Sequence, residues 1–190
     1  WDKKYCEKGW FAPSMPDLNQ ANPLVLNYLT QNAIWWIEYA DLDGLRVDTY
    51  SYNDKEGIAK WTKAIMDEYP HFNIMGEVWL NQSAQVSYWQ KDSPISAIQS
   101  YNTYLPTVMD FPLFNAVSEA FRTAPSWDKG MIQLYDNLAN DFLYKDINNL
   151  LIFAENHDTA RLNHVYPKIA DYKLIISMLA TARGIPQLYY

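Results

Sequence analysis

The chain has 190 residues, of which 49% are hydrophobic, and its formal net charge is −7. This hydrophobic content excludes a disordered chain, and no apolar run approaches the roughly 18 residues that a membrane-spanning helix requires. The negative charge argues against nucleic-acid binding, which depends on basic patches, and is compatible with a neutral binding partner.

The apolar pattern predicts strands that alternate with helices, after a loop-like opening that runs to about Asn22. The predicted strands span 44–48, 72–77, 105–110, 149–155 and 185–190. The predicted helices span about 23–39, 55–69, 112–122, 127–144 and 168–183, and a polar loop runs from the second strand to about Asn102.

Strands that alternate with helices form a parallel sheet covered by helices, so the sequence predicts an α/β fold. Five strands are too few to close a (β/α)8 barrel, but they fit the second half of one. A doubly wound open sheet is the alternative, and it lacks support because no Gly-x-Gly-x-x-Gly follows a predicted strand. The predicted fold is therefore a partial TIM barrel.

Two carboxyl residues, Asp48 and Glu77, end the first two predicted strands. The same ends of neighbouring parallel strands lie at one edge of a sheet, so both side chains should face one cleft. Glycoside hydrolysis needs such a pair, with one carboxylate as nucleophile and one carboxylic acid that protonates the leaving oxygen.

Arg46 lies two residues before Asp48, and strand alternation places both on the same face. A neighbouring guanidinium favours the ionised form of a carboxyl group, as a nucleophile requires. A structural salt bridge is the alternative interpretation of this pair. Glu77 lies between Gly76 and an aromatic residue, Trp79, which could help to keep a carboxyl group protonated; an ordinary glutamate at a strand end is the alternative.

A third polar segment, Asn156–Asp158, follows the predicted strand at 149–155. His157 could donate hydrogen bonds to sugar hydroxyls, and Asp158 could stabilise a transition state with oxocarbenium character. Metal sites and catalytic triads use the same residue types. Metal hydrolysis is poorly supported because the chain has no His-x-x-x-His, and a serine triad because it has no Gly-x-Ser-x-Gly.

These segments together resemble glycoside hydrolase family 13, the α-amylase family. Gly44–Asp48, Gly76–Trp79 and Asn156–Asp158 are similar to the family segments that follow its fourth, fifth and seventh barrel strands. Met15–Asn19 is similar to a short motif before the family's third helix, and Gly184–Tyr190 to its eighth strand. The resemblance covers essentially the whole chain, which would form the fourth to eighth strands of the catalytic barrel.

The resemblance implies that Asp48 is the nucleophile, Glu77 the acid/base residue and Asp158 the residue that stabilises the transition state. The reaction would be retaining hydrolysis of α-glucosidic bonds through a covalent glucosyl intermediate, with the carboxyl groups of Asp48 and Glu77 about 5–5.5 Å apart. A transglycosylase or isomerase of the same family is an alternative function, and a non-catalytic glucan-binding relative is another.

The resemblance also implies that Arg46, His157, Trp79 and Tyr50 contact the substrate. The expected partner is an α-glucan oligosaccharide derived from starch, such as a maltooligosaccharide, pullulan or a cyclodextrin. Met15 favours the neopullulanase and cyclomaltodextrinase branch, as found in bacterial starch-utilisation systems. Such enzymes are expected in the periplasm or outside the cell.

The chain itself is expected to be one part of a longer enzyme, since both of its ends look cut and the family's first three barrel strands have no counterpart. Residues 1–13 resemble the tail of a domain inserted between the third strand and third helix. The isolated chain is therefore expected to be inactive. No cofactor or metal is expected in this segment, while Ca²⁺ could bind the full-length protein through residues outside it.

Overall fold

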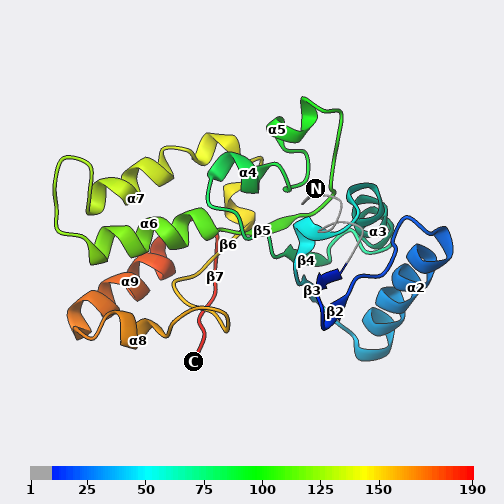
Figure 1. Ribbon diagram of the computed structural model, residues 1–190, viewed down its shortest axis with the longest axis horizontal. Helices are drawn as coiled ribbons and strands as arrows, with labels where there is room; N and C mark the ends of the chain where they lie inside the picture. Colours follow the sequence, from blue (N-terminus) through cyan, green and yellow to red (C-terminus); the bar gives the residue numbers. More distant parts are fainter. Residues whose placement is uncertain (1–9) are drawn as a thin grey trace.

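The computed structural model describes residues 10–190, which form a parallel sheet with helices packed against it (Figure 1). The sheet has five strands in the order β3–β4–β5–β6–β7, which is also their order along the chain. These strands are Gly44–Val47, Asn73–Gly76, Thr107–Met109, Leu150–Ile152 and Ile185–Pro186. The predicted α/β fold with a parallel sheet is confirmed.

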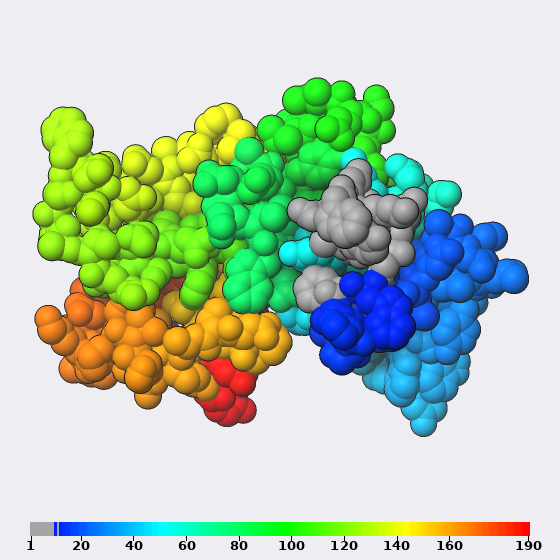
Figure 2. Space-filling view, viewed as in Figure 1, coloured from blue at the N-terminus to red at the C-terminus, as the bar shows by residue number. Residues whose placement is uncertain are grey.

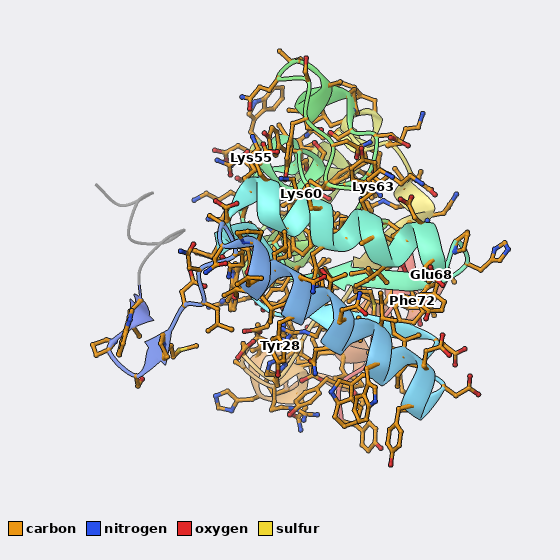
Figure 3. The ribbon with its side chains drawn as sticks, turned by 90° about the vertical axis from the view of Figure 1, so that its right-hand side faces the viewer. Tyr28, Lys55, Lys60, Lys63, Glu68 and Phe72 are labelled. Atoms are coloured by element: carbon orange, nitrogen blue, oxygen red, sulfur yellow. The ribbon has the colours of Figure 1, made fainter. Side chains whose placement is uncertain are left out.

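Long helices follow four of the predicted helical segments closely. They are α2 at Pro23–Ala40, α3 at Lys55–Glu68, α6 at Phe111–Arg122 and α9 at Ile169–Thr181. Figure 1 shows α2 and α3 at one end of the sheet and α6, α9 and a further helix, α7 at Met131–Leu138, at the other. In Figure 3, α2 and α3 lie side by side, with Lys55 at the start of α3 and Glu68 towards its end.

Side-chain caps explain where several of these helices begin. The Asn22 side chain accepts a hydrogen bond from the Leu24 amide at the start of α2, where Pro23 is the first helical residue. Asp54 caps α3 and Asp110 caps α6 in the same way. Each of these residues binds an amide that the first helical turn leaves without a partner.

The two faces of the sheet bury different residues, as strand alternation requires. Towards the helices, Ile74, Val108 and Leu150 join the main hydrophobic core. On the opposite face, a smaller cluster contains Met109, Phe111, Leu151 and Phe153, packed against Met75, Phe114 and Ile185. In a barrel, this second face is the one that points to the interior.

A buried ion cluster connects the residue before the turn into β7, Arg183, to the start of α6 and to the segment after α7. Arg183 contacts Asp110 at 2.7 Å and Asp141 at 2.6 Å. Asp110 is fully buried, so its charge is balanced within the fold rather than by water.

The structure differs from the sequence prediction in several segments. The opening predicted as a loop contains an antiparallel hairpin, β1 at Trp10–Ala12 and β2 at Met15–Pro16. The helix predicted at 127–144 is shorter: α7 spans Met131–Leu138 and follows a turn that ends at Gly130, whose φ is 81°. The strand predicted at 185–190 pairs with β6 over two residues only.

Short elements account for the rest of the chain. The predicted polar loop after β4 contains two helices, α4 at Ser83–Ser87 and α5 at Pro94–Ala97, and α8 spans Leu162–Val165. Single turns of 3₁₀ helix are η1 at Tyr50–Tyr52, η2 at Asp141–Leu143 and η3 at Ile147–Asn149. Elements this short carry too few apolar positions for a periodic signal.

Of the tail predicted at 1–13, residues 1–9 lie outside the described part. Among residues 10–190, no helix combines the length and apolar character needed to cross a bilayer.

Candidate active site

The register of β3 and β4 brings Asp48 and Glu77 together. Val47 pairs with Gly76 at the last rung of the ladder, so the next residue of each strand leaves the sheet at the same edge. The backbone continues this pairing for one more bond, from the Glu77 amide to the Val47 carbonyl at 2.9 Å. The two carboxyl residues therefore lie side by side at the ends of neighbouring parallel strands, as predicted.

One guanidinium contacts both carboxyl groups. Arg46 donates from Nη1 to Asp48 Oδ1 and from Nη2 to Glu77 Oε1, each at 2.9 Å. The Asp48 side chain is 61% exposed and that of Glu77 only 6%, so one carboxylate is open to a ligand and the other is enclosed. The predicted pairing of Arg46 with Asp48 is confirmed, and the contact with Glu77 extends it.

The second oxygen of Glu77 is held by the backbone. The Thr49 amide donates to Glu77 Oε2 at 2.8 Å. Thr49 has a φ of 45°, which is uncommon for a β-branched residue and marks local strain. No residue type in the sequence indicates this contact, because its donor is a backbone amide.

Gly76 makes room for the packing behind this turn. A Cβ added there would lie 2.5 Å from Leu105 Cδ2 and 3.0 Å from Tyr50 Cγ. Two buried side chains therefore occupy the space that a larger residue would need at position 76.

The structure argues against Tyr50 as a substrate contact. Its side chain is fully buried, and its hydroxyl lies 2.8 Å from Thr62 Oγ1 on α3. Burial raises the pKa of this hydroxyl. The residue follows the nucleophile candidate in sequence, but the η1 turn directs its ring into the core rather than towards solvent.

The segment after β6 forms a tight polar turn. Asn156 is fully buried, and its Oδ1 accepts a hydrogen bond from the Asp158 amide at 3.0 Å. His157 Nε2 lies 3.1 Å from Asp158 Oδ2, and both side chains are substantially exposed. The turn thus presents a histidine and a carboxyl group to solvent.

Two further residues, which were not among the predicted site residues, fix this turn. Glu155 is buried and binds Arg161 Nε at 2.9 Å and the Leu162 amide at 2.6 Å. Arg161 also donates to the Tyr189 carbonyl at 3.2 Å, which links the turn to the chain after β7. A glutamate before the Asn-His-Asp run and an arginine three residues after it could have indicated such a pair.

A chain of ring contacts connects Trp79, in the segment after β4, to the segment after β6. Its indole stacks on Phe111 with a centroid distance of 4.7 Å, and Phe111 meets Phe153 edge to face at 5.1 Å. Figure 2 shows the segment after β4, in green, adjoining the segment after β6, in orange. Trp79 is 43% exposed, so part of its ring is open to a ligand. That it keeps Glu77 protonated stays a prediction.

A cavity of about 430 Å³ lies beside β3, and Arg46 and Asp48 form part of its wall. The remainder comes largely from apolar side chains of α2 and α3, including Trp36 and Trp61. Among the described strands, β3 is hydrogen-bonded to β4 alone, so its other edge is free. Within residues 10–190, no group of three or more His, Cys, Asp or Glu side chains is arranged to hold a metal ion.

Comparison with known sequences gives a consistent set of relatives. Residues 2–190 match the family described as "Alpha amylase, catalytic domain". An intracellular maltogenic amylase of Bacillus subtilis is 30% identical over 183 residues, which cover 95% of this chain and 28% of the relative. A cyclomaltodextrinase of Geobacillus thermopakistaniensis is 30% identical over 184 residues, with the same two coverages. The chain thus spans less than a third of the length of these curated relatives.

A solved structure supports the barrel interpretation. The α-amylase of Geobacillus thermoleovorans, crystallised with acarbose, superposes with a TM-score of 0.82 at 30% sequence identity. The match covers all of this chain and 41% of that one. The five strands and their helices therefore correspond to part of a larger barrel.

Proposed function

The chain belongs to the α-amylase family, and from this we propose that it carries the catalytic carboxyl groups of an enzyme that hydrolyses α-glucosidic bonds with retention of configuration. The observation that carries the proposal is the arrangement around Arg46, whose guanidinium binds Asp48 and Glu77 at the ends of adjacent strands. Retaining glycosidases use two carboxyl groups at short separation.

Asp48 is the proposed nucleophile. Its exposed carboxylate can reach a bound sugar, while the Arg46 guanidinium stabilises its negative charge before attack. It would attack the anomeric carbon and form a glucosyl ester as the glycosidic C–O bond breaks. The carboxyl group is released again when water attacks the same carbon.

Glu77 is the proposed acid and base. It would give its proton to the departing glycosidic oxygen in the first step and take a proton from the attacking water in the second. Its enclosed position and its two donors, Arg46 and Thr49, fix the direction of the carboxyl group. A fixed direction favours proton transfer, because the carboxyl oxygen must lie about 2.6–3.2 Å from the oxygen that receives or gives up the proton.

Asp158 and His157 are proposed to act from the loop after β6. Asp158 would face the positive charge that develops on the sugar ring, and His157 would donate a hydrogen bond to a sugar hydroxyl. The Asn156 side chain supports this role, because it fixes the backbone of the turn that presents them. Trp79 offers an exposed ring on which a sugar could stack.

The proposed substrates are α-glucans derived from starch. The names of the relatives favour this class, since they are a maltogenic amylase and a cyclomaltodextrinase. We place the chain in the neopullulanase and cyclomaltodextrinase branch, with maltooligosaccharides, pullulan and cyclodextrins as substrates. The proposed steps use side chains of this chain and no cofactor.

The proposal is tested with the full-length protein on maltoheptaose and β-cyclodextrin. Proton NMR should show the α-anomer as the first product, because two displacements at one carbon restore its configuration. Initial formation of the β-anomer would overturn the proposal, as would equal turnover by the Asp48→Asn variant.

A further inference from the structure

The turn that follows β3 connects the nucleophile candidate to the acid/base candidate through its backbone. Asp48 directly follows β3, the Thr49 amide binds Glu77 Oε2, and the Tyr50 amide binds the Glu77 carbonyl at 3.0 Å. Two successive amides of the turn therefore hold Glu77, one through its side chain and one through its backbone. The position of Glu77 depends on the conformation of this turn.

The conformation is strained at Thr49 and needs support from its surroundings. A β-branched residue at a φ of 45° persists only where neighbouring contacts determine the backbone. From one side, Asn53 Nδ2 donates to the carbonyls of Thr49 and Tyr50 at 3.3 and 3.2 Å. Asn53 is held in turn by Gln20, whose Nε2 lies 3.3 Å from its Oδ1.

From the other side, the Tyr50 side chain anchors the turn to the core. Its hydroxyl lies 2.8 Å from Thr62 Oγ1 and 3.4 Å from the Thr103 carbonyl. Its ring packs over Gly76, the residue before Glu77, and meets the Trp89 ring edge to face at 6.0 Å. A fully buried ring with a bonded hydroxyl has one position, so it can fix the residues attached to it.

We propose that Tyr50 is a positioning residue for Glu77. Its buried hydroxyl and ring hold the strained turn in place, so that the Thr49 amide remains on Glu77 Oε2 and the carboxyl group keeps its direction. This inference rests on the proposed function, because it assumes that Glu77 is the acid and base. It assigns to Tyr50 a role through the backbone instead of a contact with substrate.

If Tyr50 positions Glu77, the rate lost on changing Tyr50 should depend on the leaving group of the substrate. Misplacing a reacting group by about 1 Å can cost on the order of 100-fold in rate. Acid assistance matters for an alcohol leaving group and little for fluoride, which leaves without a proton. A misdirected Glu77 should therefore slow cleavage of a natural glucan far more than glycosylation by a glycosyl fluoride.

The test compares full-length wild-type protein with Tyr50→Phe, which removes only the hydroxyl, and Thr62→Val, which removes its partner on α3. We expect each variant to lower kcat/KM for maltotriose by about 10-fold and for α-maltosyl fluoride by less than about twofold. The matched control is Tyr144→Phe, because Tyr144 is also buried but lies in the connection between η2 and η3. Tyr144→Phe should change kcat/KM for maltotriose and kcat/KM for α-maltosyl fluoride by the same small factor.

Equal losses on the two substrates, or no loss in either variant, would overturn the inference. If Tyr50→Phe does not fold, Thr62→Val alone decides the outcome, since it leaves the tyrosine ring in place. A wild-type protein that cleaves neither substrate would instead refute the proposed function.

Discussion

Asp48 and Glu77 bind two different nitrogens of the same arginine, Arg46, each at 2.9 Å. The carboxyl groups are therefore linked by a planar group of fixed geometry, and neither can move far without breaking a charged hydrogen bond. This relationship sets the spacing on which the proposed chemistry depends.

Replacement of Arg46 by lysine should damage this arrangement although it keeps the positive charge. An ammonium group is a point charge and cannot span the two carboxyl groups as a guanidinium does. We expect kcat/KM of the full-length protein to fall by about 100-fold, consistent with a misplacement of about 1 Å. Steady-state kinetics on maltotriose measure the loss. Lys63→Arg, a change at an exposed ion pair on α3, is the control and should leave the rate unchanged; similar rates for both variants would contradict the prediction.

The two carboxyl groups should respond differently to neutral replacement. Asp48→Asn should remove nearly all turnover on every substrate, because no other group is proposed to form the intermediate. Glu77→Gln should spare the glycosylation step for α-maltosyl fluoride, whose leaving group needs little acid assistance. Rapid-quench measurement of that step distinguishes the roles. Comparable losses on fluoride and maltotriose would argue against Glu77 as the acid.

Gly76→Ala should destabilise the protein. The added methyl group would lie 2.5 Å from Leu105 and 3.0 Å from Tyr50, both of which are fully buried. Overpacking of this kind typically costs about 1–3 kcal/mol. Urea denaturation of the full-length protein measures the change. An unaltered midpoint would show that the two side chains can move aside.

Buried tyrosines should make stability fall at alkaline pH. Burial raises the pKa of both Tyr50 and Tyr144 above the unfolded value of about 10. A raised pKa contributes stability that is complete below pH 10 and is lost as pH rises towards the folded-state pKa. The free energy of unfolding should drop by up to about 1.4 kcal/mol per pH unit for each such group. Urea titrations at pH 9, 10 and 11 measure how steeply the free energy of unfolding falls with pH. Tyr144→Phe should make this fall less steep. The same pH dependence in the wild type and the variant would contradict a raised pKa for Tyr144.

The 190-residue chain by itself should be inactive. Among the described strands, β3 has a partner on one side only, and this strand carries the proposed nucleophile. An open edge pairs with other chains, and a poorly fixed strand misplaces its reacting group. An assay of the purified chain on maltooligosaccharides, with the full-length protein as reference, decides the matter. Turnover comparable to the reference would show that the rest of the barrel is dispensable.

The sequence predicted the sheet well because its strands are apolar runs separated by amphipathic helices. It also placed Asp48 and Glu77 correctly at adjacent strand ends, since their separation in the sequence is about the length of one strand–helix–strand unit. The helix starts predicted at about residues 23, 55 and 112 agree with α2, α3 and α6, which begin at Pro23, Lys55 and Phe111.

Other parts of the site have no sequence signal of comparable strength. The Thr49 contact is made by a backbone amide, and the strain at that residue depends on packing that only the folded chain reveals. Tyr50 was predicted to contact the substrate, whereas the η1 turn buries it. The hairpin at the start of the described residues has strands too short for an alternating pattern.

Arg46, Asp48 and Glu77 together would carry the same net charge before and after the first step of the proposed reaction. Before the first step, a protonated Glu77 and an ionised Asp48 leave the three side chains neutral in sum. After it, Asp48 is esterified and Glu77 is ionised, so the sum is again neutral and the guanidinium has only exchanged one counter-ion for the other. Because the cation contacts both partners in advance, the proposed reaction would move the negative charge from Asp48 to Glu77 without large reorganisation of the protein around it.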